Sequence, residues 1–184
     1  TTGFLVRASA LYRFDVSGSY TETLVKTLTS NARAYWETWN GDSYYSNGTD
    51  SGRVSAAGAW FPWGMETPAA PVITAIAGTL TPGNYQVALT YTNTTTGEEG
   101  GCAGSTLTEL TAAGGLRVTL PGASPGATHV NVYCSPTNGG VPLLQTTVAI
   151  GTAYHDITSS VIVGRQCQTM YEEPLPAGTQ VALA

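Results

Sequence analysis

Apolar and polar side chains alternate with a period of two along much of this chain, which is the pattern of β-strands. Residues 20–28 place Tyr20, Glu22, Leu24 and Lys26 on one face of a predicted strand. Asn-Gly pairs readily adopt the positive φ angles of tight hairpin turns. We therefore expect an antiparallel meander of about four strands, with strand-like runs at 4–15, 20–28, 32–39 and 44–46 and turns at 17–19, 40–41 and 47–48.

The later part of the chain carries a longer series of strand patterns separated by turn residues. Tyr85, Val87, Leu89 and Tyr91 share one face of the second strand of this series. About seven short strands with regularly spaced turns predict a β-sandwich. The predicted strands cover residues 72–77, 83–93, 105–110, 115–120, 128–134, 142–148 and 161–170.

Composition supports an all-β fold and excludes several kinds of partner. Only 10% of the 184 residues are charged, and Lys26 is the single lysine, so long solvated helices are not expected. A net charge of −5 argues against nucleic acid as a partner, because phosphate neutralisation needs clustered basic residues. No apolar run approaches the roughly 20 residues that cross a bilayer, so we expect no membrane insertion.

The two parts differ in aromatic content, which suggests a domain boundary. All four tryptophans fall within residues 36–63, and a stiff connector, Thr67-Pro-Ala-Ala-Pro71, follows them. We expect a Trp- and Tyr-rich meander at 1–66, a sandwich at 67–172 and a C-terminal extension at 173–184.

Two segments resemble known β architectures. ALYRFDVSGSYTETL, at residues 10–24, resembles a β-propeller blade, with a hydrophobic strand, a glycine turn and a Thr-rich strand. GTLTPGNYQVALTYTNTTTGEEGG, at residues 78–101, resembles the opening hairpin of fibronectin type III-like (Ig-like) domains of bacteriophage virion proteins. GGLRVTLPGASPGATHVNVYCSPTNGG, at 114–140, continues the likeness, and TAYHDI, at 152–157, resembles the turn before the final strand.

These resemblances imply a phage structural or tail protein that assembles in the host bacterial cytoplasm and is located in the virion. A single blade has apolar residues on both faces and cannot cover both, so it needs neighbours. We expect a homo-oligomer, a trimer or a hexamer, or packing against other virion proteins, with residues 1–65 forming most of the contact.

Six aromatic residues of the first part are candidate binding residues, for a glycan or for a neighbouring subunit. Exposed aromatic rings bind sugars by burying apolar area. The same rings also suit the core of a small meander and the seam between the two domains, which is the interpretation we favour. The six are Trp36, Trp39, Tyr44, Tyr45, Trp60 and Trp63.

Neither a metal site nor an active site is indicated. The oxygen-rich cluster Asp42, Asn47, Thr49, Asp50 and Ser51 lacks the spacing of a regular calcium loop, and turn formation explains the same residues. We expect no metal and no cofactor.

The groups that serve as acids, bases or nucleophiles are also poorly placed for catalysis. His129 and His155, the latter beside Asp156, lie far apart in sequence, and no nucleophile-elbow motif occurs. The acidic pairs 98–99 and 172–173 are adjacent residues, which point to opposite faces of a strand. We expect the protein not to be an enzyme.

Three cysteines, an odd number without a CxxC pair, are expected to be mostly buried free thiols, the alternative being one disulfide plus a free thiol. A reducing cytoplasm seldom preserves disulfides. Cys134 is expected to be buried on the face of Val130 and Val132, whereas Cys102 and Cys167 carry no pattern of their own.

Taken together, these patterns predict a non-enzymatic structural component of a phage particle, in the tail, a fibre or another exterior module, that serves as an assembly scaffold or attachment spacer. Two alternatives remain open: a carbohydrate-binding module for host-surface glycans, and a bacterial adhesin domain.

Overall fold

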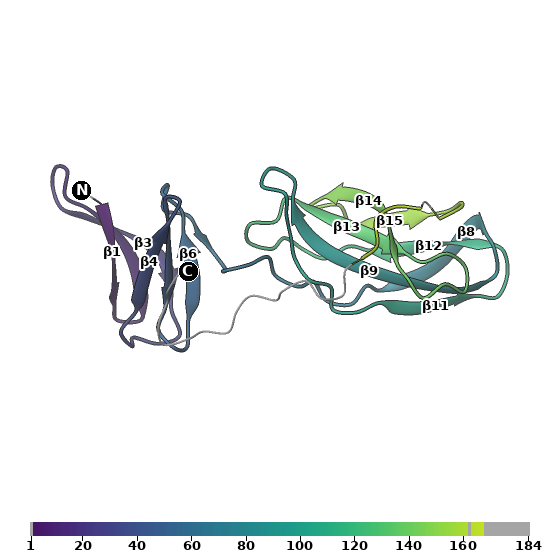
Figure 1. Cartoon of the computed structure of the whole chain (residues 1–184), viewed down its shortest axis with the longest axis horizontal. Helices are drawn as coiled ribbons and strands as arrows, with labels where there is room; N and C mark the ends of the chain where they lie inside the picture. Colours follow the sequence, from purple (N-terminus) through teal and green to yellow (C-terminus); the bar gives the residue numbers. More distant parts are fainter. Residues whose placement is uncertain (1, 162, 168–184) are drawn as a thin grey trace. The chain divides into compact units, whose positions relative to one another are not determined.

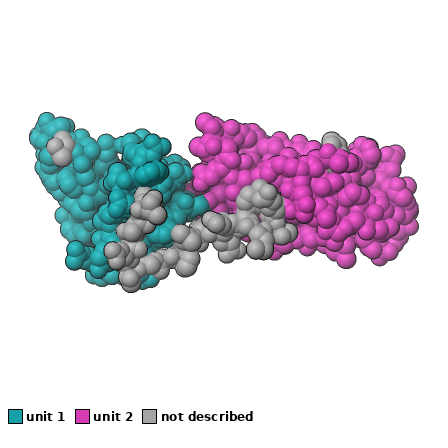
Figure 2. Space-filling view, viewed as in Figure 1, with its two compact units in different colours: residues 1–64, 174–184 teal, residues 65–173 magenta. Residues whose placement is uncertain are grey.

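The computed structural model describes residues 2–161 and 163–167, and every regular element among them is a β-strand. The all-β prediction is therefore confirmed. The chain divides into two compact units, the first ending at Gly64 and the second beginning at Met65 (Figures 1 and 2). Met65 was expected in the first domain. Its side chain instead belongs to the core of the second unit, where it is 4% exposed.

The first unit consists of two antiparallel sheets. The three-stranded sheet has the order β1-β2-β3, and the four-stranded sheet has the order β4-β5-β6-β7. The strands are β1 (Thr2–Arg7), β2 (Ala10–Asp15), β3 (Thr21–Thr27), β4 (Tyr35–Trp39), β5 (Asp42–Ser46), β6 (Ser51–Val54) and β7 (Trp60–Phe61).

The expected single blade of about four strands is wrong. The run at 4–15 is a hairpin rather than one strand, because Ala8 and Ser9 adopt φ angles of 49° and 56° and reverse the chain. The two sheets pack on a core of their own, so each covers one face of the other. This core joins the buried Leu11, Leu28, Tyr45 and Val54 to the partly buried Phe4, Val6, Val25, Trp36 and Trp60.

The second unit contains a three-stranded and a five-stranded antiparallel sheet. The smaller sheet has the order β15-β12-β8. In the larger one β9 pairs with β13, which pairs with β14, and β9 also pairs with β10 and β11. The strands are β8 (Ile73–Leu80), β9 (Gly83–Asn93), β10 (Glu98–Glu99), β11 (Thr106–Leu110), β12 (Gly114–Thr119), β13 (His129–Cys134), β14 (Leu143–Ala149) and β15 (Tyr154–Ile157).

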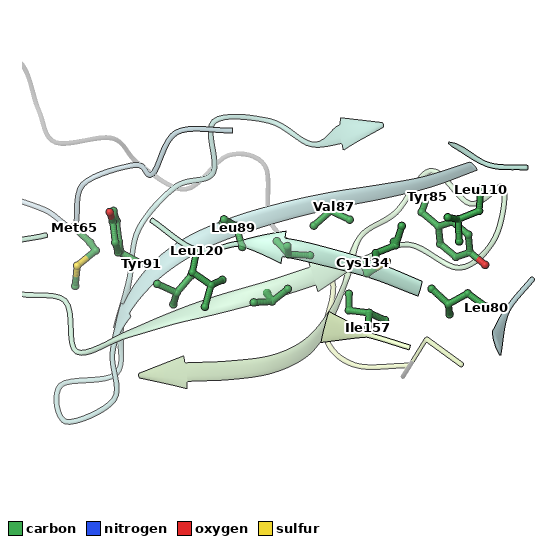
Figure 3. Packing of buried hydrophobic residues seen from close by; sticks show 14 residues of the cluster. Met65, Leu80, Tyr85, Val87, Leu89, Tyr91, Leu110, Leu120, Cys134 and Ile157 are labelled. Atoms are coloured by element: carbon green, nitrogen blue, oxygen red, sulfur yellow. The ribbon is translucent and has the colours of Figure 1, made fainter. Parts of the chain in front are cut away.

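The inner faces of these sheets form the large core shown in Figure 3. The prediction that Tyr85, Val87, Leu89 and Tyr91 share a buried face is confirmed, since all four belong to this core. Leu116 and Val118 of β12 and Val130, Val132 and Cys134 of β13 also belong to it, and each of these five is at most 1% exposed.

The last predicted strand, 161–170, is wrong for the residues that the structure describes. Residues 163–167 form only an isolated bridge, between Gln166 and Leu143. The strand at this end of the chain is β15, within a segment expected to be a turn. It pairs with β12, with Ile157 opposite Leu116, which completes the smaller sheet. Residues 162 and 168–184, which include the acidic pair 172–173 and the extension at 173–184, lie outside the described residues.

Candidate functional site

A groove of about 510 Å³ lies in the first unit, lined by residues of both sheets. The strand registers explain which side chains face it. Phe4 pairs with Arg13, and Thr38 pairs with Ser43, so the members of each pair point to the same side of their sheet. All four line the groove, together with Trp36 and the turn residue Gly41.

The groove exists because the core ends at an aromatic pair. The rings of Phe4 and Trp36 are stacked, with centroids 5.7 Å apart and planes 10° apart. Beyond them, Thr38 and Ser43 occupy the next inward positions on the larger sheet, and their side chains are too short to fill the space between the sheets. The result is a hollow with an aromatic wall and a hydroxyl-bearing wall.

The six aromatic residues predicted as a possible binding surface do not form one exposed row. Trp36 and Tyr45 contact each other in the core, with ring centroids 5.2 Å apart, and Tyr45 is 1% exposed. Trp60 donates a hydrogen bond of 3.0 Å from Nε1 to the Tyr45 hydroxyl. Burial raises the pKa of Tyr45.

The remaining three of these residues are scattered. Trp63 is half-buried, and its Nε1 donates to the carbonyl oxygen of Gly52 at 2.8 Å. Tyr44 is also half-buried, whereas Trp39 is 61% exposed at the end of β4. The structure therefore brings Trp36, Tyr45 and Trp60 together as core residues, and Trp36 alone of the six lines the groove.

The oxygen-rich cluster at 42–51 is a hydrogen-bonded turn. Asp50 accepts the backbone N–H groups of Thr29 and Ser30 at 2.8 and 2.9 Å. Burial alone would raise the pKa of Asp50, but these hydrogen bonds lower it. Asn47 Oδ1 accepts the N–H of Asp50 at 2.6 Å, and Asp42 pairs with Arg53. Among the described residues, no three His, Cys, Asp or Glu side chains gather as a metal site.

The two histidines are not brought together. His129 lies on β13 with Nδ1 2.9 Å from the Thr128 hydroxyl oxygen, and His155 lies on β15 in the other sheet. Asp156 binds Arg117 through both carboxylate oxygens, at 2.8 and 2.7 Å, and this pairing lowers its pKa. Burial lowers the pKa of His155.

A buried acid that sequence reasoning did not single out lies on the outer face of the larger sheet. The Glu99 side chain is 7% exposed and accepts hydrogen bonds of 2.5 Å from the hydroxyls of Thr90 and Tyr133. It also pairs with Arg165 of the segment that runs beside β14. Burial alone would raise the pKa of Glu99, but these partners hold it below its usual value.

A small apolar cluster lies on this same face. It contains Ala88, Tyr133, Cys167, Cys102 and Leu144. The signal for it is the consecutive apolar residues 132–134, Val-Tyr-Cys, since a strand with one exposed face would alternate more strictly.

A second hollow, of about 490 Å³, lies in the second unit. Its wall includes Thr81, Tyr85 and Thr137, which bond to one another: the Tyr85 hydroxyl lies 2.7 Å from Thr81 O and 2.6 Å from Thr137 Oγ1. Among the described residues, no charged side chain lines it. The groove of the first unit offers more binding chemistry, because a guanidinium, hydroxyls and aromatic rings meet there.

None of the described residues belongs to a helix capable of spanning a membrane. No family model matches the chain, and a search of curated proteins finds no matching relative.

Proposed function

We propose that this chain is a non-enzymatic structural module of a bacteriophage particle, located in its tail, a fibre or another exterior part, and that it assembles through its first unit. The resemblance to fibronectin type III-like phage domains supports the proposal. The segments that carry this resemblance, 78–101 and 114–140, contain β9, β10, β12 and β13 of a two-sheet unit with one continuous core.

The observation that carries the proposal is the outer face of the β1-β2-β3 sheet. Leu5, Tyr12 and Leu24 are cross-strand partners and form a row across all three strands. Phe14 and Tyr20 stack beside this row, with ring centroids 6.2 Å apart. Leu24 is 55% exposed and Tyr20 is 58% exposed.

The outer face of this sheet therefore carries an exposed apolar row, crossed by the Arg7–Glu22 ion pair, and the core of the first unit covers only the inner face. Exposed apolar patches rimmed by polar groups mark interaction surfaces. Burying a large apolar side chain contributes about 1.5–3 kcal/mol, so covering this row favours association. In a closed ring of identical subunits each of these surfaces is covered by a neighbour, and no open end remains. We propose a trimer or a hexamer, or an equivalent contact with another virion protein.

The structure also changes which substitution tests this proposal. Trp36 is one of the aromatic residues in the region expected to form the contact, but it lies between Phe4 and Tyr45 in the core. Replacing it would damage the fold of the first unit. Leu24 is the better position, because it lies on the outer face and its side chain is mostly exposed.

Sedimentation velocity of the full chain tests the assembly. We expect the wild type to sediment as a trimer or hexamer and Leu24→Asp to sediment as a monomer with unchanged β-sheet circular dichroism. Leu107→Asp is the matched control, because Leu107 is 63% exposed on β11 of the second unit, and it should remain oligomeric. A wild type that stays monomeric at its highest soluble concentration without any bound virion protein would contradict the proposal.

A second candidate function, carbohydrate binding, is supported by the groove between the two sheets. Its wall combines aromatic and hydroxyl-bearing side chains, which are the groups that contact the apolar faces and hydroxyls of sugars. Such binding suits an attachment role and is compatible with assembly through the opposite face of the β1-β2-β3 sheet.

A further inference from the structure

We infer that the groove of the first unit binds an anionic sugar residue, and that Arg13 receives its acidic substituent. The inference rests on the second candidate function, carbohydrate binding, and specifies the class of sugar. It does not depend on the proposed assembly.

Arg13 differs from every other basic residue of the chain. The sequence contains seven Lys and Arg residues, against twelve Asp and Glu. Four form ion pairs with carboxylates, and two lie against aromatic rings. Within the described part of the chain, Arg13 alone has neither a carboxylate within 4.0 Å nor a ring contact. The ion pairs are Arg7–Glu22, Arg53–Asp42, Arg117–Asp156 and Arg165–Glu99, and the ring contacts are Lys26–Trp60 and Arg33–Tyr35.

The nearest acidic residue along the strand does not neutralise Arg13. The carboxylate of Asp15 accepts the backbone N–H of Ser17 at 2.7 Å. That hydrogen bond is the main cause of its lowered pKa, and the charge of Arg13 is the smallest contribution. An acidic ligand group would therefore be the first direct counter-charge for this guanidinium.

The fold positions Arg13 toward the groove. It pairs with Phe4 across the β1–β2 hairpin and so faces the inner side of the sheet. The stem of its side chain lies against Gly58, where an added β-carbon would be 3.1 Å from Arg13 Cδ. Gly58 also has a φ of 88°, a conformation that disfavours any other residue. The loop between β6 and β7 thus supports the side chain of Arg13.

The other walls suit a sugar rather than a simple anion. The hydroxyl groups of Thr38 and Ser43 line the groove and have no hydrogen-bond partner among the described residues, so they are available to sugar hydroxyls. Phe4 and Trp36 offer apolar surface for a pyranose ring. The volume of about 510 Å³ falls within the usual range of small-ligand sites, roughly 300–1,000 Å³.

We expect an acidic substituent on the sugar because of the chemistry of the Arg13 guanidinium. Its planar N–H groups bind carboxylate and sulfate oxygens in pairs, which a neutral hydroxyl cannot match. A uronic acid, a sialic acid or a sulfated sugar each carries such oxygens. We expect the site to prefer these sugars over their neutral counterparts.

Isothermal titration calorimetry on the full chain tests the inference with four probes: glucuronic acid, N-acetylneuraminic acid, glucose 6-sulfate and glucose. We expect at least one acidic sugar to bind, and the best of them identifies the substituent. Arg13→Gln should weaken that binding about tenfold or more. Arg33→Gln is the matched control, because Arg33 is exposed, does not line the groove, and should leave binding unchanged. A thermal melt shows that both variants fold.

Three outcomes overturn the inference, and they are distinguishable. Equal binding of glucose and the acidic sugars, unaffected by Arg13→Gln, would reject the anionic specificity and keep carbohydrate binding. Binding of an acidic sugar that Arg13→Gln leaves intact would place the site elsewhere. Failure of all four sugars to bind would reject both the inference and the second candidate function, and the assembly would still be judged by sedimentation.

Discussion

At the scale of single residues, the buried acid Glu99 attaches the segment that contains Arg165 to the larger sheet of the second unit. Its carboxylate accepts hydrogen bonds from Thr90 on β9 and Tyr133 on β13 and pairs with Arg165 beyond β15. Arg165 lies in the stretch whose backbone bonds to β14, with Leu144 N donating to Arg165 O at 2.8 Å. The polar network therefore joins three separate parts of the chain.

This network predicts a pH-dependent stability. Because the folded state lowers the pKa of Glu99, its stabilising contribution is complete above the ordinary carboxyl pKa of about 4.3 and disappears as the pH falls through the folded-state value. We expect Glu99→Gln to lower the unfolding free energy at pH 7 by about 1–3 kcal/mol and to lose less stability on acidification than the wild type. Urea unfolding at pH 7 and pH 3 measures both effects.

Glu109→Gln provides the comparison, since Glu109 is exposed on β11. It should reproduce the wild-type stability at both pH values. If Glu99→Gln keeps the same loss of stability between the two pH values as the wild type, the acid dependence arises elsewhere.

The thiols give a second prediction at this scale. The three cysteines are free in the structure, and burial raises the pKa values of Cys134 and Cys167 to about 12. Alkylating reagents attack the thiolate, so these two should react slowly in the native state. We expect iodoacetamide at pH 8 to label Cys102 first and all three after unfolding without reductant. Mass spectrometry that finds two labels missing from the unfolded chain would indicate a disulfide instead.

At the scale of elements, the sequence predicts the strands of the second unit better than those of the first. The faces of β9 and β13 could be predicted because their apolar residues recur with a period of two and fill one core. The place of β15 could not, because it depends on pairing with β12, a partner that no local pattern identifies. The covering of the outer face by Glu99 and Arg165 depends on a similarly long-range contact.

In the first unit the missed feature is the turn at Ala8 and Ser9. Tight hairpin turns usually contain glycine or asparagine, and neither residue occurs there. The groove was also beyond prediction, because it arises from two sheets whose packing the sequence does not reveal. Of the six predicted aromatic residues only Trp36 lines it, whereas Arg13 carried no sequence signal.

The strained turn yields a stability prediction. A residue with a β-carbon in the left-handed region costs about 1–2 kcal/mol relative to glycine. We expect Ser9→Gly to raise the unfolding free energy of the first unit by about 1 kcal/mol. Ser9→Ala keeps the β-carbon and should bring no gain. Tryptophan fluorescence during urea unfolding is the suitable measurement, because all four tryptophans belong to the first unit. Equal stability of the two variants would show that the turn is not strained.

At the scale of the whole molecule, each unit has its own hydrophobic core. The core of the first unit is the smaller one: among the described residues it has four buried apolar side chains, against fourteen in the main core of the second unit. We expect both units to fold and the first to be the less stable of the two. The tryptophan-rich composition ends next to the division at Gly64.

Separate cores predict separate responses to mutation. Leu116 is fully buried in the second unit, and Leu116→Ala should lower the stability of that unit by about 2–5 kcal/mol. The tryptophan fluorescence transition, which reports the first unit, should remain where it is in the wild type. Far-UV circular dichroism measures the unfolding transition of the second unit. A shift of the fluorescence transition by a similar amount would show that the two units unfold together.

We propose that the chain is a building block of a phage particle, and quantitative mass spectrometry of particles purified by density gradient from the bacterium that produces the chain tests this most directly. We expect its peptides to sediment with the particles, to withstand washing with concentrated salt, and to occur at a fixed copy number that is a multiple of three. Peptides that remain in the soluble fraction, or that accompany the particles in variable trace amounts, would contradict it.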